Sequence, residues 1–323
     1  MSGYPETPSC FLKPNMTNPP PSYDPSRIGT LFYPDVATLA QEAAQASLSP
    51  ASEDPSNIHL LVIDMQVDFC HEQGTLHVPG AAHDIRRLIE FIYRNVERIT
   101  SITCSLDSHL THQIFHPSWW ADEEGNHPAP FTVITRQHVK QGLWRPLIEP
   151  EWSKAYVKKL QEGKKKELTI WPYHVPIGGV GHALDPELWS AVFWHSVARR
   201  SQPTWWTKGS VAKTEHYSIL RPEIPVSNVP PIEMTSLLEK LGNQDHLIIA
   251  GEASSHCVLE TVEDLVEEFS GKPDILDRIF ILRDCTSPVV HPGIDFAALT
   301  AERFAQFEEQ GIHLILSTDP LPT

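Results

Sequence analysis

The chain passes from a predicted strand into a predicted helix within the stretch His246-Leu247-Ile248-Ile249-Ala250-Gly251-Glu252-Ala253-Ser254-Ser255-His256-Cys257-Val258. Its first part is apolar and rich in β-branched residues, which is typical of a buried central strand. From Cys257 onward, apolar residues recur at helical spacing until a stop signal at Gly271. Open α/β sheets bind ligands outside the carboxyl ends of their strands, so this junction predicts a functional site.

Cys257 is the candidate nucleophile at this junction. A thiol at a helix N-terminus meets free backbone N–H groups and the positive end of the helix dipole, and both favour the nucleophilic thiolate. The same N–H groups, in the turn before Cys257, could bind a developing oxyanion. The alternative is a buried structural cysteine, which is a common fate of a free cysteine.

The rest of the chain repeats the alternation of strand and helix. Further strands are predicted at residues 58–63, 99–106, 204–207, 278–283 and 312–316, with helices between them. This pattern predicts one α/β domain, doubly wound, with a mainly parallel six-stranded sheet and helices on both faces.

We expect this domain to span residues 58–323, after a Pro-rich arm and linker at residues 1–57. Phe11, Tyr23, Leu31, Phe32 and Tyr33 are the aromatic and apolar residues that could anchor the arm. A long stretch at about 108–167 shows no clear periodicity and is interpreted as an insertion of irregular structure, a lid or binding loop.

The composition excludes several classes of partner. The chain has 323 residues, 41 acidic against 25 basic side chains and a formal net charge of −16, which argues against nucleic acid or an anionic membrane. It has no apolar run of about 20 residues and no signal-peptide core at its start. Five cysteines without paired spacing favour a reducing compartment, so we expect a cytoplasmic protein.

Four reactive side chains fall at or just after predicted strand ends: Asp64, Asp107, Lys208 and Cys257. Because the carboxyl ends of parallel strands share one edge of a sheet, we expect them to meet in one crevice. A poorly solvated carboxylate such as Asp64 could take the proton of the thiol. Lys208 could hold that carboxylate and stabilise charge, so the set predicts acyl transfer by a cysteine nucleophile.

A second group of residues predicts a metal site. Asp107 and His109 lie two apart in an extended segment and therefore point the same way, and His174 follows another short apolar run. One carboxylate and two imidazoles with open positions suit zinc, iron or manganese. His112 and His116 are further candidates, although a lone histidine is more often a solvated or core residue.

Five ordered segments resemble the isochorismatase-like cysteine hydrolases and, within them, the nicotinamidases. The resemblance extends over about residues 58–316. The segments are Asp64-Met65-Gln66-Val67-Asp68-Phe69, Asp107-Ser108-His109, Trp171-Pro172-Tyr173-His174, Lys208-Gly209 with His216-Tyr217-Ser218, and Gly251 to Val258. They are similar to the family's D-x-Q-x-D-F, D-x-H, W-P-x-H, K-G…D-x-Y-S-x-F and G-x-A-x-x-x-C-V segments. The chain departs from the nicotinamidase pattern after His109, where His112 comes one place early.

The resemblance implies a cysteine amidohydrolase that cleaves a small, nicotinamide-like carboxamide to acid and ammonia through a thioester. It implies Asp64, Lys208 and Cys257 as catalytic residues and the N–H groups of Ala253 and Cys257 as the oxyanion hole. It further implies a cis peptide between Glu252 and Ala253. A divalent metal, zinc before iron or manganese, is implied on Asp107, His109 and His174.

The resemblance also implies a flat-ring substrate and a homo-oligomer. Phe69, with Trp119 or Trp120, is expected to stack on the substrate ring. Two alternatives remain open: a ureido or carbamoyl amide hydrolase of the same fold that needs no metal, and a non-catalytic binding protein on this fold.

Overall fold

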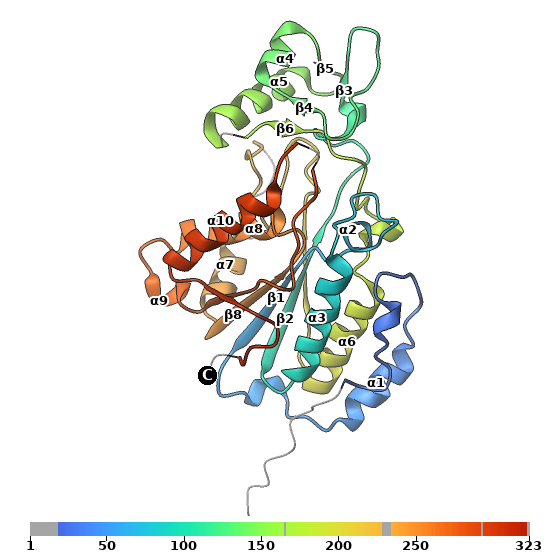
Figure 1. Ribbon diagram of the computed structural model, residues 1–323, viewed down its shortest axis with the longest axis vertical. Helices are drawn as coiled ribbons and strands as arrows, with labels where there is room; N and C mark the ends of the chain where they lie inside the picture. The colour runs from blue at the N-terminus through green and yellow to red at the C-terminus, as the bar shows by residue number, and fades with distance from the viewer. Residues whose placement is uncertain (1–18, 165, 228–233, 292, 322–323) are drawn as a thin grey trace, which may run out of the picture.

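The computed structural model describes residues 19–164, 166–227, 234–291 and 293–321. Its centre is a six-stranded sheet of parallel strands, namely β1 (Ile58–Ile63), β2 (Ile99–Asp107), β7 (Thr204–Lys208), β8 (His246–Gly251), β9 (Ile279–Leu282) and β10 (His313–Ile315). The strand order is β10-β9-β8-β1-β2-β7 (Figure 1). This architecture confirms the predicted doubly wound α/β fold.

Helices cover both faces of the sheet. One face carries α1 (Val36–Gln45), α3 (Ala81–Arg94) and α6 (Pro186–Arg199), and the other carries α7 (Met234–Gly242), α8 (Cys257–Glu268) and α10 (Phe296–Glu309). Two shorter helices are α2 (Val67–Cys70) and α9 (Pro273–Leu276). Strand β1 sends Leu60 and Val62 into one core and Leu61 and Ile63 into the other, which explains its continuous apolar sequence. No helix among the described residues has the length and apolar character needed to cross a membrane.

The insertion at residues 108–167 is folded, so the expectation of an irregular loop is wrong. Its elements are β3 (Trp120–Ala121), β4 (Val133–Ile134), α4 (Arg136–Gln141), β5 (Arg145–Pro146), α5 (Pro150–Lys159) and the π-helical turn Leu160–Lys164, with β6 (Leu168–Thr169) directly after it. These elements lie together at the top of Figure 1. Trp119 and Trp120 are buried there, and short strands with wide spacing gave the sequence no detectable period.

The described part of the N-terminal segment lies against the body of the same chain. The Tyr23 ring packs on Tyr93 of α3 with centroids 5.6 Å apart, and the Gly29 N–H donates to Asp185 Oδ2 at 3.0 Å. Leu31 and Tyr33 are exposed and are not anchors, and Phe11 falls outside the described residues. The division of the chain at residue 57 stays a prediction.

Gly251, the last residue of β8, allows two strand ends to approach closely. Its φ is +138°, and a Cβ atom there would lie 2.1 Å from the carbonyl oxygen of Ile63. The next N–H, of Glu252, donates to that same oxygen at 2.8 Å. A glycine is therefore required for the turn that leads to Cys257 to sit beside the end of β1.

We expect Gly251→Ala to lower the free energy of unfolding by about 3 kcal/mol or more, because the side chain adds a backbone clash to an unfavourable φ. Urea unfolding would measure it. Gly271→Ala is the matched control: its φ is +79° and no atom lies within 4 Å of the added Cβ. That control should cost only about 1 kcal/mol. Equal losses for the two variants would contradict the role of the close approach.

Candidate active site

Lys208 is the centre of a cluster of buried side chains at the carboxyl ends of four neighbouring strands. Its Nζ atom lies 3.0 Å from Asp64 Oδ2, 3.0 Å from Asp107 Oδ1 and 3.5 Å from Cys257 Sγ, and it donates to the His216 carbonyl at 2.9 Å. Asp64 follows β1, Asp107 ends β2, Lys208 ends β7 and Cys257 follows β8. The sheet order thus brings together four residues that are up to 193 positions apart (257 − 64 = 193).

The charges of this cluster shift one another's pKa values. Burial raises the pKa of Asp64, and the nearby Lys208 ammonium opposes this increase. Burial disfavours the Lys208 ammonium, but the Asp107 and Asp64 carboxylates outweigh it and raise the pKa of that amine. The result is one buried ammonium held between two buried carboxylates.

Cys257 is held as a thiol in the free protein. Burial raises the pKa of its thiol well above the usual range; Lys208 opposes the increase, whereas Asp64 and Asp107 add to it. Burial and the two nearby carboxylates therefore oppose the thiolate that the helix N-terminus favours. Nucleophilic chemistry at this sulfur would need a base, and Asp64, whose pKa burial raises, interacts with the thiol directly.

Two polar side chains hold the carboxylates in place. Ser105 donates its hydroxyl to Asp64 Oδ1 at 2.6 Å. The Gln66 side chain forms two hydrogen bonds with the backbone of Asp107. Its Oε1 accepts from the Asp107 N–H at 2.7 Å, and its Nε2 donates to the Asp107 carbonyl at 2.8 Å. Gln66 therefore ties the turn after β1 to the end of β2. It lies within the D-x-Q-x-D-F segment, which is the signal that could have identified it.

Asp107, His109 and His174 form a buried group that could hold a metal ion. One ligand atom from each lies within 4.8 Å of the other two, and His109 Nε2 is 2.8 Å from Asp107 Oδ2. The Nδ1 atoms of His109 and His174 face the carbonyls of Gly209 and Pro172, at 3.2 and 2.7 Å, which leaves both Nε2 atoms turned toward the carboxylate. Burial lowers the pKa of His174 to about 3, so its imidazole is neutral, as a ligand must be. The donor set fits a divalent cation.

The other two candidate histidines differ from this group. His112 is exposed, and its Nδ1 lies 3.2 Å from the Ser118 hydroxyl. His116 is buried next to the group, with ring centroids 6.1 Å from His109 and 6.2 Å from His174.

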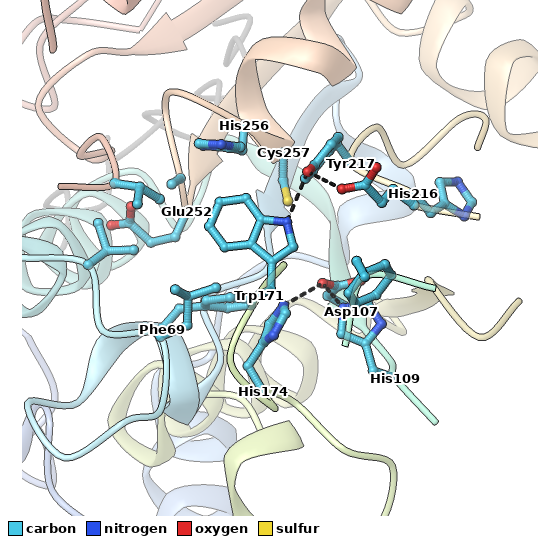
Figure 2. A pocket seen from close by; sticks show the side chains of 16 residues that line it. Phe69, Asp107, His109, Trp171, His174, His216, Tyr217, Glu252, His256 and Cys257 are labelled. Atoms are coloured by element: carbon cyan, nitrogen blue, oxygen red, sulfur yellow. Dashed lines mark hydrogen bonds and ion pairs between the residues drawn. The ribbon is translucent and has the colours of Figure 1, made fainter. Parts of the chain in front are cut away.

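A cavity opens in front of Cys257 and is lined mainly by apolar and aromatic side chains (Figure 2). Phe69 is on its wall, as predicted, together with the metal-site residues and with Trp171. Trp119 and Trp120 do not line it: their indole N–H groups bond Ser153 Oγ and the Ile114 carbonyl inside the insertion. The expectation that those two tryptophans line the cavity is therefore wrong. The tryptophan on the cavity wall is Trp171 of the W-P-x-H segment.

The turn before Cys257 presents free donors. The peptide between Glu252 and Ala253 is cis. Within the described residues, neither the Ala253 N–H nor the Cys257 N–H donates to a protein acceptor, whereas the Ala253 carbonyl accepts from His256 and Val258. Two unused N–H groups beside a thiol can stabilise negative charge on a substrate oxygen.

The cavity wall is held by a chain of hydrogen bonds that sequence reasoning missed. Trp171 Nε1 donates to the Tyr217 hydroxyl at 3.0 Å, and Tyr217 donates to Glu215 Oε1 at 2.6 Å. Tyr156, from α5 of the insertion, donates to Glu215 Oε2 at 3.0 Å. Burial raises the pKa of Glu215 to about 7; hydrogen bonds from both tyrosines oppose this increase, and Glu223 adds to it.

Comparison with known proteins gives the fold. No protein-family model and no curated protein sequence matches this chain. Among solved structures, the yeast nicotinamidase Pnc1p bound to the inhibitor nicotinaldehyde aligns with a TM-score of 0.55 and 19% identity, over 80% of this chain and 99% of that chain. The Acinetobacter baumanii nicotinamidase/pyrazinamidase aligns with a TM-score of 0.54 and 19% identity, over 83% and 100% of the two chains. The chain shares the fold of these proteins.

Glu215 should make stability fall as the pH rises from about 4.5 to 7. The folded state keeps a proton that the unfolded chain has already lost, so ionisation in this window favours unfolding. We expect the free energy of unfolding of the wild type, relative to Glu215→Gln, to fall by up to about 3 kcal/mol across the window. Urea unfolding at pH 4.5 and 8 measures it, and a difference that does not change with pH would show that Glu215 does not titrate there.

Proposed function

We propose that this protein is a cysteine-dependent amidohydrolase that converts a small, flat carboxamide of the nicotinamide type to its acid and ammonia. The observation that carries the proposal is the contact of one buried ammonium, Lys208, with the Asp64 carboxylate and the Cys257 sulfur at the wall of a mostly apolar cavity. The shared fold with two nicotinamidases supports it.

The first half of the reaction forms a thioester. Asp64 takes the proton of Cys257 while the sulfur bonds to the carboxamide carbon, and the carbonyl oxygen gains the negative charge. The N–H groups of Ala253 and Cys257 stabilise that oxygen. Asp64 then gives its proton to the leaving nitrogen, and ammonia departs.

The second half reverses these proton movements. A water molecule gives a proton to Asp64 and attacks the thioester carbon, and the same two N–H groups hold the oxyanion. The carbon–sulfur bond breaks, Asp64 returns the proton to sulfur, and the acid leaves. Lys208 stays charged throughout, because it keeps Asp64 in place and balances the carboxylates at each stage.

The cavity selects a planar substrate. Phe69 and Trp171 offer aromatic faces on its wall, and such faces favour a flat ring. Asp107, His109 and His174 would hold a divalent metal, with zinc favoured and iron or manganese suitable. When bound there, the metal would supply a Lewis acid for a ring nitrogen or a bound water. The presence of this donor set favours the nicotinamidase type over a ureido hydrolase that needs no metal.

The proposal includes a cellular setting and an assembly state. The described cysteines, Cys70, Cys104, Cys257 and Cys285, are free thiols, which suits a reducing cytoplasm. Assembly as a homo-oligomer rests on the family resemblance.

Cys257→Ala should abolish ammonia release from nicotinamide, a drop of at least about 10⁴-fold, because no other side chain can form the thioester. A coupled ammonia assay measures it, with circular dichroism to show that the fold persists. Cys104→Ala, which removes a buried thiol within β2, is the matched control and should stay active. Wild-type protein that releases no ammonia from any carboxamide or ureide would reject the proposal.

Purified protein should bind about one divalent ion per chain, and His174→Ala should lose it. Elemental analysis measures the ion, and a lower melting temperature after chelation gives a second readout independent of activity. His112→Ala, at an exposed histidine, should keep the ion. Full activity in metal-free protein would favour the ureido hydrolase instead.

A further inference from the structure

The turn that carries Cys257 is fastened to the loop after β9. The Gly251 N–H donates to the Cys285 carbonyl at 3.1 Å, and the Ser254 N–H donates to the Ser287 carbonyl at 2.9 Å. One further bond continues the contact, from the Val289 N–H to Ser255 Oγ at 3.0 Å. The backbone on either side of the Glu252–Ala253 peptide is therefore fixed by a neighbouring loop.

Between these bonds lies a pair of buried acids. Glu252 and Asp84 of α3 are each only 1% exposed. Ser287 serves both: its N–H donates to Glu252 Oε2 at 3.2 Å, and its hydroxyl donates to Asp84 Oδ2 at 2.5 Å. Arg87 donates to the other Asp84 oxygen at 2.6 Å. Asp84 thus has the partners of an ionised carboxylate, whereas Glu252 has no cation among the described residues.

Glu252 is the protonated member of the pair. Burial raises its pKa well above the usual range, and the charge of Asp84 and a hydrogen bond to it add to the increase. Glu252 Oε1 receives no donor from the described residues, as expected of an oxygen that itself carries the proton. A neutral carboxyl can then donate to the Asp84 carboxylate, which satisfies both groups.

The side chain does not act on substrate directly. In Figure 2 the Glu252 side chain lies on the wall of the cavity, with its carboxyl directed away from the Cys257 sulfur. Its carbonyl carbon, however, forms the peptide bond to the Ala253 nitrogen, whose N–H is one of the two free donors. Its own N–H is held by the Ile63 carbonyl at 2.8 Å, next to Asp64.

A buried acid at this position is expensive for folding. An apolar side chain of similar size would avoid the desolvation of a carboxyl group, and such replacements are often neutral or stabilising. Gly80 leaves space for the Ser287 side chain that contacts Asp84, since a Cβ on Gly80 would lie 2.6 Å from Ser287 Oγ. A group that lowers stability in the turn before Cys257 is explained by a positioning role in that turn.

We propose that Glu252 is a positioning residue: its carboxyl, held by the Ser287 N–H next to Asp84, fixes the Glu252–Ala253 peptide so that the Ala253 N–H faces the oxygen that becomes negative. The role rests on the proposed amidase function. It predicts that losing the carboxyl weakens stabilisation of the tetrahedral state and leaves ground-state binding unchanged.

The test compares Glu252→Leu with Glu252→Gln. Nicotinaldehyde is the probe, because its carbonyl carbon bonds to Sγ, the thiol proton leaves through Asp64, and the resulting oxygen occupies the oxyanion site. For Glu252→Leu we expect kcat and aldehyde affinity to fall together by about 10- to 100-fold, with nicotinate affinity and KM within about twofold of wild type. The melting temperature should be equal or higher.

Glu252→Gln keeps a donor for Asp84 and an acceptor for Ser287, so it should recover at least about a third of kcat and of aldehyde affinity. Unchanged kcat and aldehyde affinity in Glu252→Leu, or equal losses in both variants, would overturn the role.

If the leucine variant does not fold, Ser287→Ala, which removes one donor to Asp84, should show the same selective loss. Wild-type protein that neither releases ammonia nor binds the aldehyde rejects the amidase function itself, whereas an active wild type with an unaffected leucine variant rejects only this role.

Discussion

A single buried ammonium holds the site together. Lys208 Nζ contacts carboxylates that follow two different strands, and at the same time the sulfur that follows a third. Two carboxylates cannot be buried this closely without a cation, because the desolvation of each charge would cost several kcal/mol. The ends of β1, β2, β7 and β8 must therefore lie in one order and one register, and the turns that leave them are fixed by the same requirement.

This electrostatic arrangement also determines how the thiol reacts. Burial raises the pKa of the Cys257 thiol, and the Asp64 and Asp107 carboxylates add to the increase against the opposing effect of Lys208, so the protonated form is favoured in the free protein. In the proposed mechanism the thiolate forms only when a substrate carbonyl takes up charge and the free N–H groups stabilise it. A buried neutral thiol is protected from other electrophiles and oxidants, which a permanent thiolate would not be.

The insertion and the body build the substrate cavity jointly. Tyr156 of the insertion and Tyr217 of the body converge on Glu215, and Tyr217 in turn holds the Trp171 indole. Hydrogen bonds thus join the aromatic wall, although its parts come from segments far apart in the chain. On the opposite side, the acid pair of Glu252 and Asp84 fastens the nucleophile turn to α3. Both walls rely on buried polar contacts between segments that only the assembled fold brings together.

The sequence alone determined the sheet, because continuous apolar strands that alternate with amphipathic helices have few other ways to bury both faces. It also predicted which four charged or thiol side chains meet, since each stands at or just after the end of a predicted strand, where parallel topology gathers side chains. The tertiary structure decided the remainder. Trp119 and Trp120 looked like cavity residues by type, but they pack inside an insertion whose short strands carry no period. The protonation of Cys257, and the pairing of Glu252 with Asp84, depend on burial and on charges brought from other elements, and no local pattern of residues encodes these.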